Sequence, residues 1–272
     1  MRYITALTIA GSDSCGGAGI QADIKTMSAL GVYAASAITA VTAQNTLGVT
    51  GIEAVSPSMV AAQIRAVMTD LKPLAVKIGM VYDSATTRAI AATLSQFNVK
   101  HIVIDPVMVA TSGSRLMSAD ATEAFSKSLL PMATVLTPNI PEAEALSGVR
   151  IHNAKDCDRA GRILSKSCPG YVLIKGGHAD EGEVKRDRLY HNGIAALTVE
   201  SEAIETTNTH GTGCTLSSAI AALLARGLDV EEAVKAAKKY VSEAIRAGAF
   251  IQAGSGHGPV NHFFDPQKLI TT

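Results

Sequence analysis

A glycine-rich turn ahead of a helical pattern is the sharpest chemical signal in the chain. It reads His210-Gly211-Thr212-Gly213-Cys214. Glycines allow the backbone to direct several N–H groups to one point, and a helix that starts there adds the positive end of its dipole. The arrangement predicts an anion site that holds a phosphate during its transfer. A Gly-Thr-Gly turn alone is equally typical of an ordinary helix start, so its surroundings must decide.

Acidic, amide and basic side chains follow several predicted strands, at the edge where an open parallel sheet binds its ligands. Asp105 stands at a strand end before a proline, and Glu142 stands three residues after Asn139. Taken singly, Asp105 fits a turn residue, and Glu142 fits a helix-capping box with Asn139. Together the two acids supply the hard oxygen ligands that suit Mg²⁺. Lys175, which precedes two glycines, is either a surface charge or a point charge on a phosphate.

Two better-known phosphate-binding motifs are not met by the first glycine-rich segment. A P-loop needs Lys and then Ser or Thr where this segment has Gly17 and Ala18. A dinucleotide fingerprint needs a last glycine where Ala22 stands. A hydride-transfer fold is therefore disfavoured, although alanine is sometimes accepted at that last position.

The composition describes a folded protein with balanced charges. Hydrophobic residues make up 47% of the chain and charged residues 18%. This composition is typical of a folded protein, here with an aliphatic core. Lys and Arg number 24 and Asp and Glu number 24, so nucleic acid is not an expected partner. Four cysteines and seven histidines lack ligand spacing, which predicts neither a disulfide framework nor a transition metal. The chain shows no membrane-spanning run and no signal-peptide pattern, so we expect a cytoplasmic protein.

Short β-branched runs alternate with longer amphipathic segments, which predicts βα units and a mainly parallel sheet. The predicted strands are residues 4–10, 35–41, 75–80, 101–105, 134–137 and 171–175. The predicted helices are residues 19–30, 58–71, 84–97, 119–130, 140–147 and 154–167. Apolar residues at helical spacing predict two further helices, over residues 216–224 and 230–245.

The dipeptide Asn192-Gly193 separates two short strand-like runs. A two-residue hairpin turn needs positive φ, which these residue types tolerate, so a small antiparallel hairpin is predicted. The polar segment 178–188 that leads into it is expected to form an exposed loop, or else a lid. No linker, low-complexity tract or internal repeat interrupts the pattern, which favours a single domain over residues 1–272.

Six motifs occur in a fixed order along the chain. They are Gly11-Ser12-Asp13, Gly16-Gly17-Ala18-Gly19-Ile20-Gln21-Ala22-Asp23, Thr42-Ala43-Gln44-Asn45-Thr46, Asp105-Pro106-Val107-Met108, Thr137-Pro138-Asn139-Ile140-Pro141-Glu142-Ala143 and Thr209-His210-Gly211-Thr212-Gly213-Cys214-Thr215. In combination they resemble the hydroxymethylpyrimidine/phosphomethylpyrimidine kinases of thiamine biosynthesis, which belong to the ribokinase-like superfamily. The resemblance runs from residue 4 to about residue 263.

The resemblance implies a three-layer α/β/α sandwich and a kinase that uses ATP with Mg²⁺. Such enzymes phosphorylate 4-amino-5-hydroxymethyl-2-methylpyrimidine to its monophosphate and then to the diphosphate. A homodimer is implied by the resemblance alone.

The resemblance also implies roles for individual residues. It places the pyrimidine near Gly11, Asp23, Gln44, Met80 and Val107. The Gln44 amide offers a donor and an acceptor to an aminopyrimidine edge, while Met80 and Val107 offer apolar walls. The remaining assignments are Asp105, Asn139 and Glu142 around Mg²⁺ and the phosphates, Lys175 and Lys238 on the nucleotide, and Gly211, Gly213 and Cys214 at the transferred phosphoryl group.

Cys214 stands where most ribokinase-like sugar kinases carry an Asp that is taken as the base. An ordinary thiol has a pKa of about 8.5, which a helix N-terminus can lower, so Cys214 is either a thiolate base or part of the anion site. Phosphoryl transfer depends more on alignment and charge stabilisation than on early deprotonation. The second acceptor is itself a phosphate, which needs no base and would be repelled by a carboxylate. We therefore hypothesise that Cys214 permits both steps.

Two other functions compete with this interpretation. A pyridoxal or pyridoxine kinase of the same superfamily also phosphorylates a hydroxymethyl group on an aromatic nitrogen ring, and some pyrimidine kinases accept pyridoxine. Gln44 in its Thr-Ala-Gln-Asn-Thr setting favours the aminopyrimidine. A nucleotide-binding protein without catalysis is disfavoured because Asp105, Glu142, Lys175 and both glycines of the turn are retained.

Overall fold

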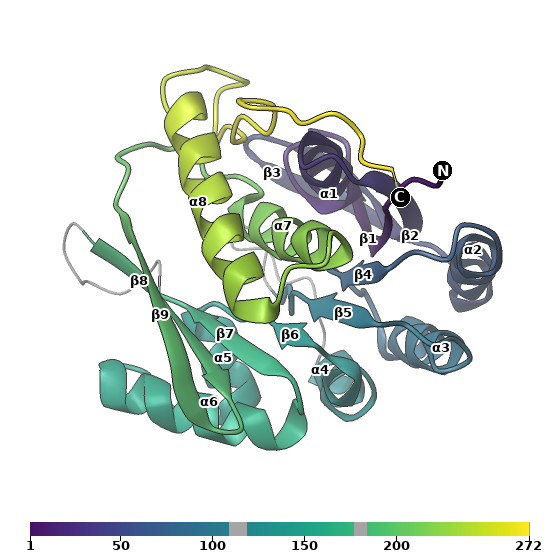
Figure 1. Ribbon diagram of the computed structural model, residues 1–272, viewed down its shortest axis with the longest axis horizontal. Coiled ribbons are helices and arrows are strands. Elements are labelled where there is room, and N and C mark those ends of the chain that lie inside the picture. Colours follow the sequence, from purple (N-terminus) through teal and green to yellow (C-terminus); the bar gives the residue numbers. More distant parts are fainter. Residues whose placement is uncertain (109–118, 177–183, 272) are drawn as a thin grey trace.

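The computed structural model describes residues 1–108, 119–176 and 184–271. A nine-stranded sheet crosses the described chain in the order β3-β2-β1-β4-β5-β6-β7-β8-β9 (Figure 1). Its strands are β1 (Thr5–Asp13), β2 (Tyr33–Asn45), β3 (Gly48–Ala54), β4 (Ala75–Ile78), β5 (His101–Ile104), β6 (Val135–Leu136), β7 (Tyr171–Lys175), β8 (Val184–His191) and β9 (Ile194–Glu202). Its helices are α1 (Gly19–Ala29), α2 (Pro57–Asp70), α3 (Ser84–Leu94), α4 (Ala119–Ser128), α5 (Ile140–Ser147), α6 (Ala154–Ser167), α7 (Thr212–Ala225) and α8 (Val230–Gly248), with a short 3₁₀ turn at Leu130–Met132.

The sheet is parallel in its centre and antiparallel at both edges. Strands β2, β1, β4, β5, β6 and β7 are parallel neighbours, whereas β3, β8 and β9 pair antiparallel. The β8–β9 hairpin turns at Asn192 and Gly193, whose φ angles are +52° and +75°. The mainly parallel sheet and the small hairpin are therefore confirmed.

Strand β3 is absent from the predicted strands. Its seven residues include Gly48 and Gly51, which lower strand propensity and give the segment the look of a loop. In the structure it pairs antiparallel with the far end of β2, where Gln44 faces Val49. The strand therefore depends on a partner that local sequence does not reveal.

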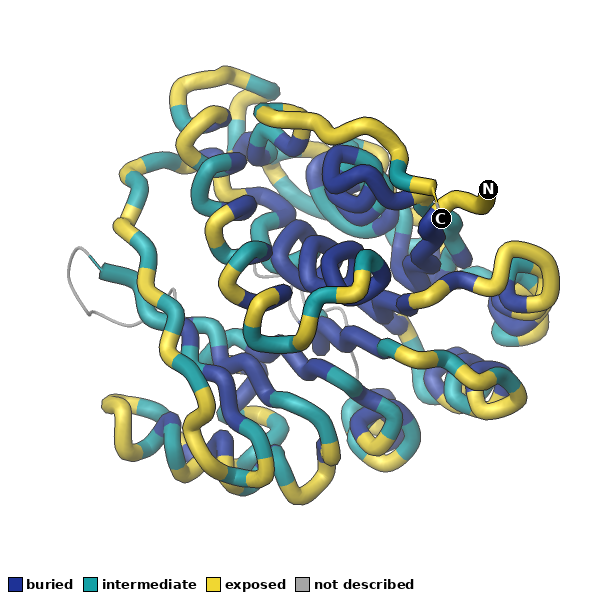
Figure 2. The backbone as a smooth tube through the Cα atoms, viewed as in Figure 1, coloured by how far each residue is buried: buried dark blue, intermediate teal, exposed yellow. Residues whose placement is uncertain are grey.

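Helices cover both faces of the sheet, as the predicted three-layer sandwich requires (Figure 1). Helices α1, α7 and α8 lie on one face, and their side chains Met27, Leu223 and Val241 belong to one hydrophobic core. Helices α2 to α6 lie on the other face, where residues such as Ile90 and Phe125 form a second core. Figure 2 shows the central strands buried between these layers, and α7 buried within its own layer.

The two cores fix the central strands in place. Within β1, Leu7 and Ile9 point into the core of α2 and α3, whereas Ala6 points into the core of α7. This alternation follows from the twofold repeat of a strand. Burying one such Leu or Ile side chain stabilises the fold by roughly 1.5–3 kcal/mol. The carboxyl ends of these strands are thereby held as a rigid edge.

Strands β1 and β2 run further than predicted. They were expected to end at residues 10 and 41, but they continue to Asp13 and Asn45. After an irregularity between Ala10 and Ser12, the pairing resumes with Ser12 beside Val41 and Asp13 beside Thr42. Two polar segments that follow predicted strands thus form a projecting ribbon at the ligand-binding edge.

Helix starts agree with the prediction to within one residue where a side chain caps them. Helices α5 and α6 have the predicted bounds, and Asn139 and Asn153 cap their first turns. Helix α3 ends at Leu94, three residues earlier than predicted. Within the described residues, no helix is both long and apolar enough to cross a membrane.

The predicted loop or lid over residues 178–188 divides into two parts. Residues 178–183 lie outside the described residues. From Val184 onward the chain already belongs to β8, so the second part is strand.

Candidate active site

A cavity of about 1110 Å³ lies along the carboxyl ends of the parallel strands, where such sheets bind ligands. Pockets for one small molecule typically have volumes of about 300–1,000 Å³, so this cavity is larger than that range. All the predicted site residues except Asp23 line it: Gly11, Gln44, Met80, Asp105, Val107, Asn139, Glu142, Lys175, Gly211, Gly213, Cys214 and Lys238.

The predicted anion turn forms the start of α7. Gly211 is its N-cap residue and has a φ of +79°, a left-handed conformation that favours glycine. A Cβ on Gly211 would lie 1.8 Å from the carbonyl oxygen of Gly17, so the turn and the first glycine-rich loop touch backbone to backbone. The Thr212 N–H donates to the Thr209 carbonyl, and no side chain caps the helix start, which leaves the N–H groups of Gly213 and Cys214 to an anion.

Asp105 and Lys175 form an ion pair opposite this turn. The Lys175 ammonium donates to Asp105 Oδ1 at 2.9 Å, and Thr137 donates to the same oxygen at 3.2 Å. Burial alone would raise the pKa of Asp105, but Lys175 and Lys77 outweigh it and hold that pKa below its usual value. A Cβ on Gly213 would lie 3.5 Å from Lys175 Nζ and 3.6 Å from Asp105 Oδ2. The ion pair therefore faces the first turn of α7.

Glu142 forms the predicted capping box and also lines the cavity. Its carboxylate accepts the Asn139 backbone N–H at 2.8 Å, and the Asn139 side chain accepts the Glu142 N–H at 2.9 Å, which completes the capping box. The same carboxylate lines the cavity. Burial raises its pKa to about 7, with Lys175 opposing the rise and Asp105 adding to it. An acidic group whose pKa is raised by burial and by a second carboxylate fits a bound dication.

The acceptor end of the cavity lies below the projecting ribbon of β1 and β2. Met80 and Ala40 form a small apolar cluster with Ile52 and Val107 packed against it. A Cβ on Gly11 would lie 3.0 Å from Met80 Sδ, so glycine keeps this wall close. The result is an apolar compartment that fits an aromatic ring.

Gln44 is held at the rim of this compartment by its own strand and by the first glycine-rich loop. Its backbone N–H donates to Ser14 Oγ at 2.8 Å, and Ser14 Oγ donates back to the Gln44 carbonyl at 2.7 Å. Thr42 Oγ1 lies 3.1 Å from the side-chain oxygen. The amide is thus placed before any ligand arrives.

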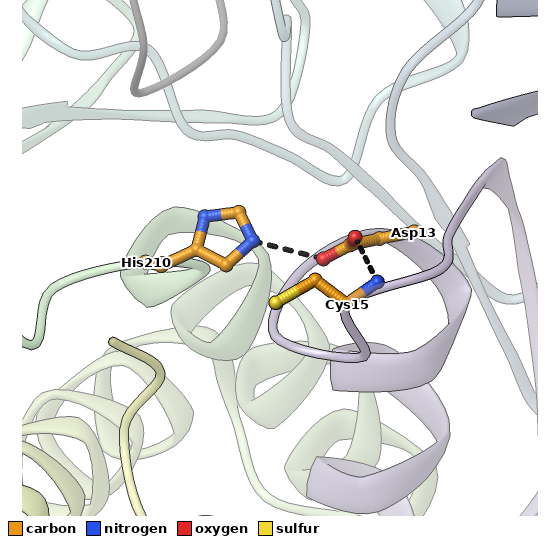
Figure 3. Close-up of side chains that lie close together, drawn as sticks. All are labelled: Asp13, Cys15 and His210. Carbon is orange, nitrogen blue, oxygen red and sulfur yellow. Dashed lines mark hydrogen bonds and ion pairs between the residues drawn. The ribbon is translucent and has the colours of Figure 1, made fainter. Parts of the chain in front are cut away.

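Asp13 and His210 join the first glycine-rich loop to the anion turn (Figure 3). His210 Nε2 lies 2.8 Å from Asp13 Oδ2, and because an ionised carboxylate only accepts, Nε2 carries the proton. Asp13 also accepts backbone N–H groups from Cys15, Gly17 and Ala18 at 2.8, 3.0 and 2.8 Å. Burial raises the pKa of Asp13, but His210 and these N–H groups together lower it by more. The pKa of Asp13 therefore lies below its usual value.

The side chains of Asp13, Cys15 and His210 bring their possible ligand atoms within 4.8 Å of one another. Figure 3 shows the Cys15 sulfur below the His210 ring and the Asp13 carboxylate beside it. Both carboxylate oxygens already accept hydrogen bonds from the loop or from His210. We therefore assign this cluster to holding the loop against the turn and not to a metal.

Lys238 extends from α8 into the opposite part of the cavity. Its ammonium donates to Asp187 Oδ2 at 2.6 Å, and the other Asp187 oxygen accepts the Gly176 N–H at 3.0 Å. Asp187 is buried, so the pair is shielded from solvent, and the chain segment 201–204 also lines the cavity.

Asp23 is the predicted site residue that the structure does not bring to the cavity. Its side chain has no exposure and forms an ion pair with Lys77 at 2.8 Å behind the cavity wall. Helix α1 places it there because Asp23 lies on the face that packs against the sheet.

The Cys214 thiol has a raised pKa. Burial raises it to about 11, Lys77 opposes the rise, and Asp23 and Asp105 add to it. The lowering expected from a helix N-terminus is therefore outweighed by desolvation. At neutral pH Cys214 is a protonated thiol, which favours a place in the anion site over a thiolate base.

Four structural contributors to the site were missed as functional residues: Asp13, Lys77, Asp187 and His210. Asp13 and His210 lie within motifs already noted, so their position beside the glycines could have identified them as site residues. Lys77 and Asp187 lie within strands and are found only once the sheet brings distant residues together.

Comparisons with known proteins agree on one family. The family model described as phosphomethylpyrimidine kinase matches residues 13–261. A hydroxymethylpyrimidine/phosphomethylpyrimidine kinase of Rhizobium meliloti is 52% identical, over 95% of this chain and 96% of that protein. The thiamine biosynthesis bifunctional protein ThiED of Geobacter sulfurreducens is 47% identical over 97% of this chain, which spans 53% of that longer protein.

A similar solved structure is that of the pyridoxal kinase from Staphylococcus aureus in complex with AMP-PCP and pyridoxal. It has a TM-score of 0.87 and 32% identity, and the match covers 97% of this chain and 94% of that one.

Proposed function

Because the chain belongs to the phosphomethylpyrimidine kinase family, we propose that it transfers phosphoryl groups from ATP to 4-amino-5-hydroxymethyl-2-methylpyrimidine and then to the monophosphate. The predicted relationship and the ribokinase-like fold are confirmed, and the protein is a kinase of thiamine biosynthesis. The observation that carries the proposal is the uncapped start of α7, which faces the Asp105–Lys175 pair in the same cavity as Gln44.

At the acceptor end, the Gln44 amide reads the aminopyrimidine edge. Its oxygen accepts from the amino group and its N–H₂ donates to a ring nitrogen, while Met80 and Val107 contact the ring faces. Support comes from the hydrogen bonds that hold the Gln44 backbone to Ser14 and from the apolar cluster beside it.

At the donor end, the nucleotide lies along Lys175 and Lys238, both of which line the cavity. Asp105, Glu142 and Asn139 supply oxygen atoms suited to Mg²⁺, which when bound neutralises charge on the transferred phosphates. Burial and the Asp105 carboxylate both raise the pKa of Glu142, and a bound dication would relieve the repulsion between the two acids.

The transfer itself takes place at the start of α7. The acceptor oxygen forms a bond to the γ-phosphorus while the bond to the leaving ADP oxygen breaks, and the hydroxyl proton is released late. The N–H groups of Gly213 and Cys214 and the Lys175 ammonium stabilise the charge on the transferred group. In the second transfer a phosphate oxygen of the monophosphate attacks in the same way, without a proton to remove.

Cys214 fits both transfers because its thiol is protonated. A carboxylate at that position would add negative charge where a phosphate must approach, whereas a neutral thiol adds none. We propose that Cys214 completes the anion site and leaves the acceptor proton to solvent or phosphate.

A second candidate function is the phosphorylation of pyridoxal or pyridoxine. The structural similarity to a pyridoxal kinase at a TM-score of 0.87 favours it specifically. We place it second because Gln44 matches the hydrogen-bonding edge of an aminopyrimidine.

Mass spectrometry of the products tests the proposal. The purified protein is given MgATP with hydroxymethylpyrimidine, with pyridoxine or with no acceptor. We expect mono- and diphosphate from the pyrimidine at a rate well above that with pyridoxine. Preferred phosphorylation of pyridoxine would favour the second candidate, and no phosphorylated acceptor in either reaction would contradict a kinase function.

Three further properties are part of the proposal. We propose one kinase domain over residues 1–272, supported by the sheet that crosses the described chain. A cytoplasmic location and a homodimer rest on the family relationship.

A further inference from the structure

Lys77 and Asp23 form an ion pair with no exposure to solvent. The Lys77 ammonium lies 2.9 and 2.8 Å from the two carboxylate oxygens. Thr8 and Ser218 each donate a hydroxyl hydrogen bond to Asp23 at 2.5 Å. Burying an ion pair costs desolvation energy, and apolar replacements are often as stable, so stability alone does not explain the pair.

The ammonium end of the pair lies against Gly79. A Cβ on Gly79 would lie 2.6 Å from Lys77 Nζ, so glycine at this position leaves room for the ammonium. The next residue, Met80, lines the cavity. The carboxylate end is enclosed on the other side by Thr8 of β1 and by Ser218, one turn beyond Cys214 on α7.

The charges of Lys77 and Asp23 both affect the pKa of the Cys214 thiol. Burial has the largest effect on the pKa of its thiol and raises it, and among the charges Lys77, which lowers it, acts more strongly than Asp23, which raises it. Lys77 thus offsets part of the effect of burial on the thiol at the start of α7.

We infer that Lys77 is an electrostatic positioning residue, whose buried ammonium, oriented by Asp23, supports the anion turn chiefly when the acceptor is a phosphate. The inference rests on the proposed function. In the first transfer a neutral hydroxymethyl group meets the triphosphate. In the second transfer the acceptor is a phosphate with a charge of about −1.5 to −2. The repulsion between this phosphate and the triphosphate is relieved by a fixed positive charge beneath them.

The test compares the two transfers in variants of the pair. Initial rates are measured separately from hydroxymethylpyrimidine and from its purified monophosphate, both with MgATP. In Lys77→Met/Asp23→Asn, which removes both charges, we expect the ratio of the second rate to the first to fall about tenfold. In Asp23→Asn, which keeps the ammonium and removes the carboxylate, the ratio stays at or above the wild-type value.

Two results would overturn the inference: a wild-type ratio in the double variant, or an equal fall of the ratio in Asp23→Asn. Thermal unfolding shows that each variant is folded, and if the single variant does not fold, the ratio in the double variant decides. A matched control is Lys127→Met/Glu123→Gln, which removes an exposed ion pair that does not line the cavity and leaves the ratio unchanged. A wild-type protein that makes no diphosphate would contradict the proposed function instead.

Discussion

The Lys175 ammonium lies 2.9 Å from Oδ1 of Asp105, although 70 residues separate them in the chain. Lys175 ends β7 and Asp105 follows β5, with only β6 between the two strands in the sheet. Parallel strands bring these ends to one edge, where both side chains face Gly213 at the start of α7. This juxtaposition places charges of both signs around the point where a phosphoryl group would be transferred.

The anion turn tolerates no side chain at its N-cap. In Gly211→Ala the added Cβ would meet the Gly17 carbonyl oxygen, and its φ of +79° is itself unfavourable for alanine. We expect kcat/KM to fall at least 100-fold, roughly the effect of losing an oxyanion-hole donor. Gly148→Ala is the control, because Gly148 has a φ of +72° but open space around it. Steady-state kinetics of both variants test this prediction. An equal loss of kcat/KM in the two variants would show that backbone strain alone causes the loss in Gly211→Ala.

Gln44 is expected to set the choice of acceptor. In Gln44→Leu the amide donor and acceptor are lost while the size of the side chain is nearly kept. We expect kcat/KM for hydroxymethylpyrimidine to fall by roughly 10- to 200-fold, with a smaller effect on pyridoxine. Parallel assays with the two acceptors measure the change in preference. An equal loss for both acceptors would mean that Gln44 only shapes the compartment.

Cys214 is expected to matter through its charge. Cys214→Asp places a carboxylate beside the approaching phosphate, so the second transfer should lose at least tenfold more rate than the first. Cys214→Ser keeps a neutral group and should slow both transfers alike. A loss of the second step no larger than that of the first in Cys214→Asp would contradict this role.

Glu142 should impose a pH dependence near neutrality. Because burial raises its pKa to about 7, with Asp105 adding to the rise and Lys175 opposing it, the carboxyl is increasingly protonated as the pH falls from 8 to 6. The protonated form cannot bind Mg²⁺ as an anion, so kcat/KM for MgATP should decrease over that range. In Glu142→Gln we expect a lower activity without this decrease, and an unchanged pH profile would exclude Glu142 as its origin.

The same group should affect the stability of the ligand-free protein in the opposite direction. Its pKa in the folded state is higher than in the unfolded state, so the unfolded chain binds fewer protons between the two values. The contribution of Glu142 to the free energy of unfolding is therefore fully present below pH 4 and is lost as the pH rises through about 7. Denaturant titrations at pH 5 and 7.5 should differ less in Glu142→Gln than in wild type.

Much of the fold could be predicted because its signals are local. Helix α5 has its predicted bounds since Asn139 and Glu142 form a capping box, and the β8–β9 hairpin follows from Asn192-Gly193. Strand β3 could not be predicted, because two glycines weaken its pattern and only pairing with β2 makes it a strand.

Site residues could be predicted where their motifs fall at strand ends. They could not be predicted where burial decides the position or the pKa of a side chain. Lys175 and Gly213 could be placed together because parallel strands share one edge. Asp23 belongs to a motif, yet its ion pair with Lys77 takes it behind the cavity, and only the packing of α1 on the sheet shows this. The raised pKa of Cys214 likewise depends on desolvation, which spacing along the chain does not reveal.

A progress curve of the wild-type protein tests the central claim most directly. Hydroxymethylpyrimidine and excess MgATP are mixed with the purified protein, and ³¹P NMR follows the phosphorylated products. The account predicts that the monophosphate rises and then declines as the diphosphate forms, with two ATP consumed for each diphosphate. Monophosphate that accumulates without conversion, or ATP consumption without any phosphorylated pyrimidine, would contradict it.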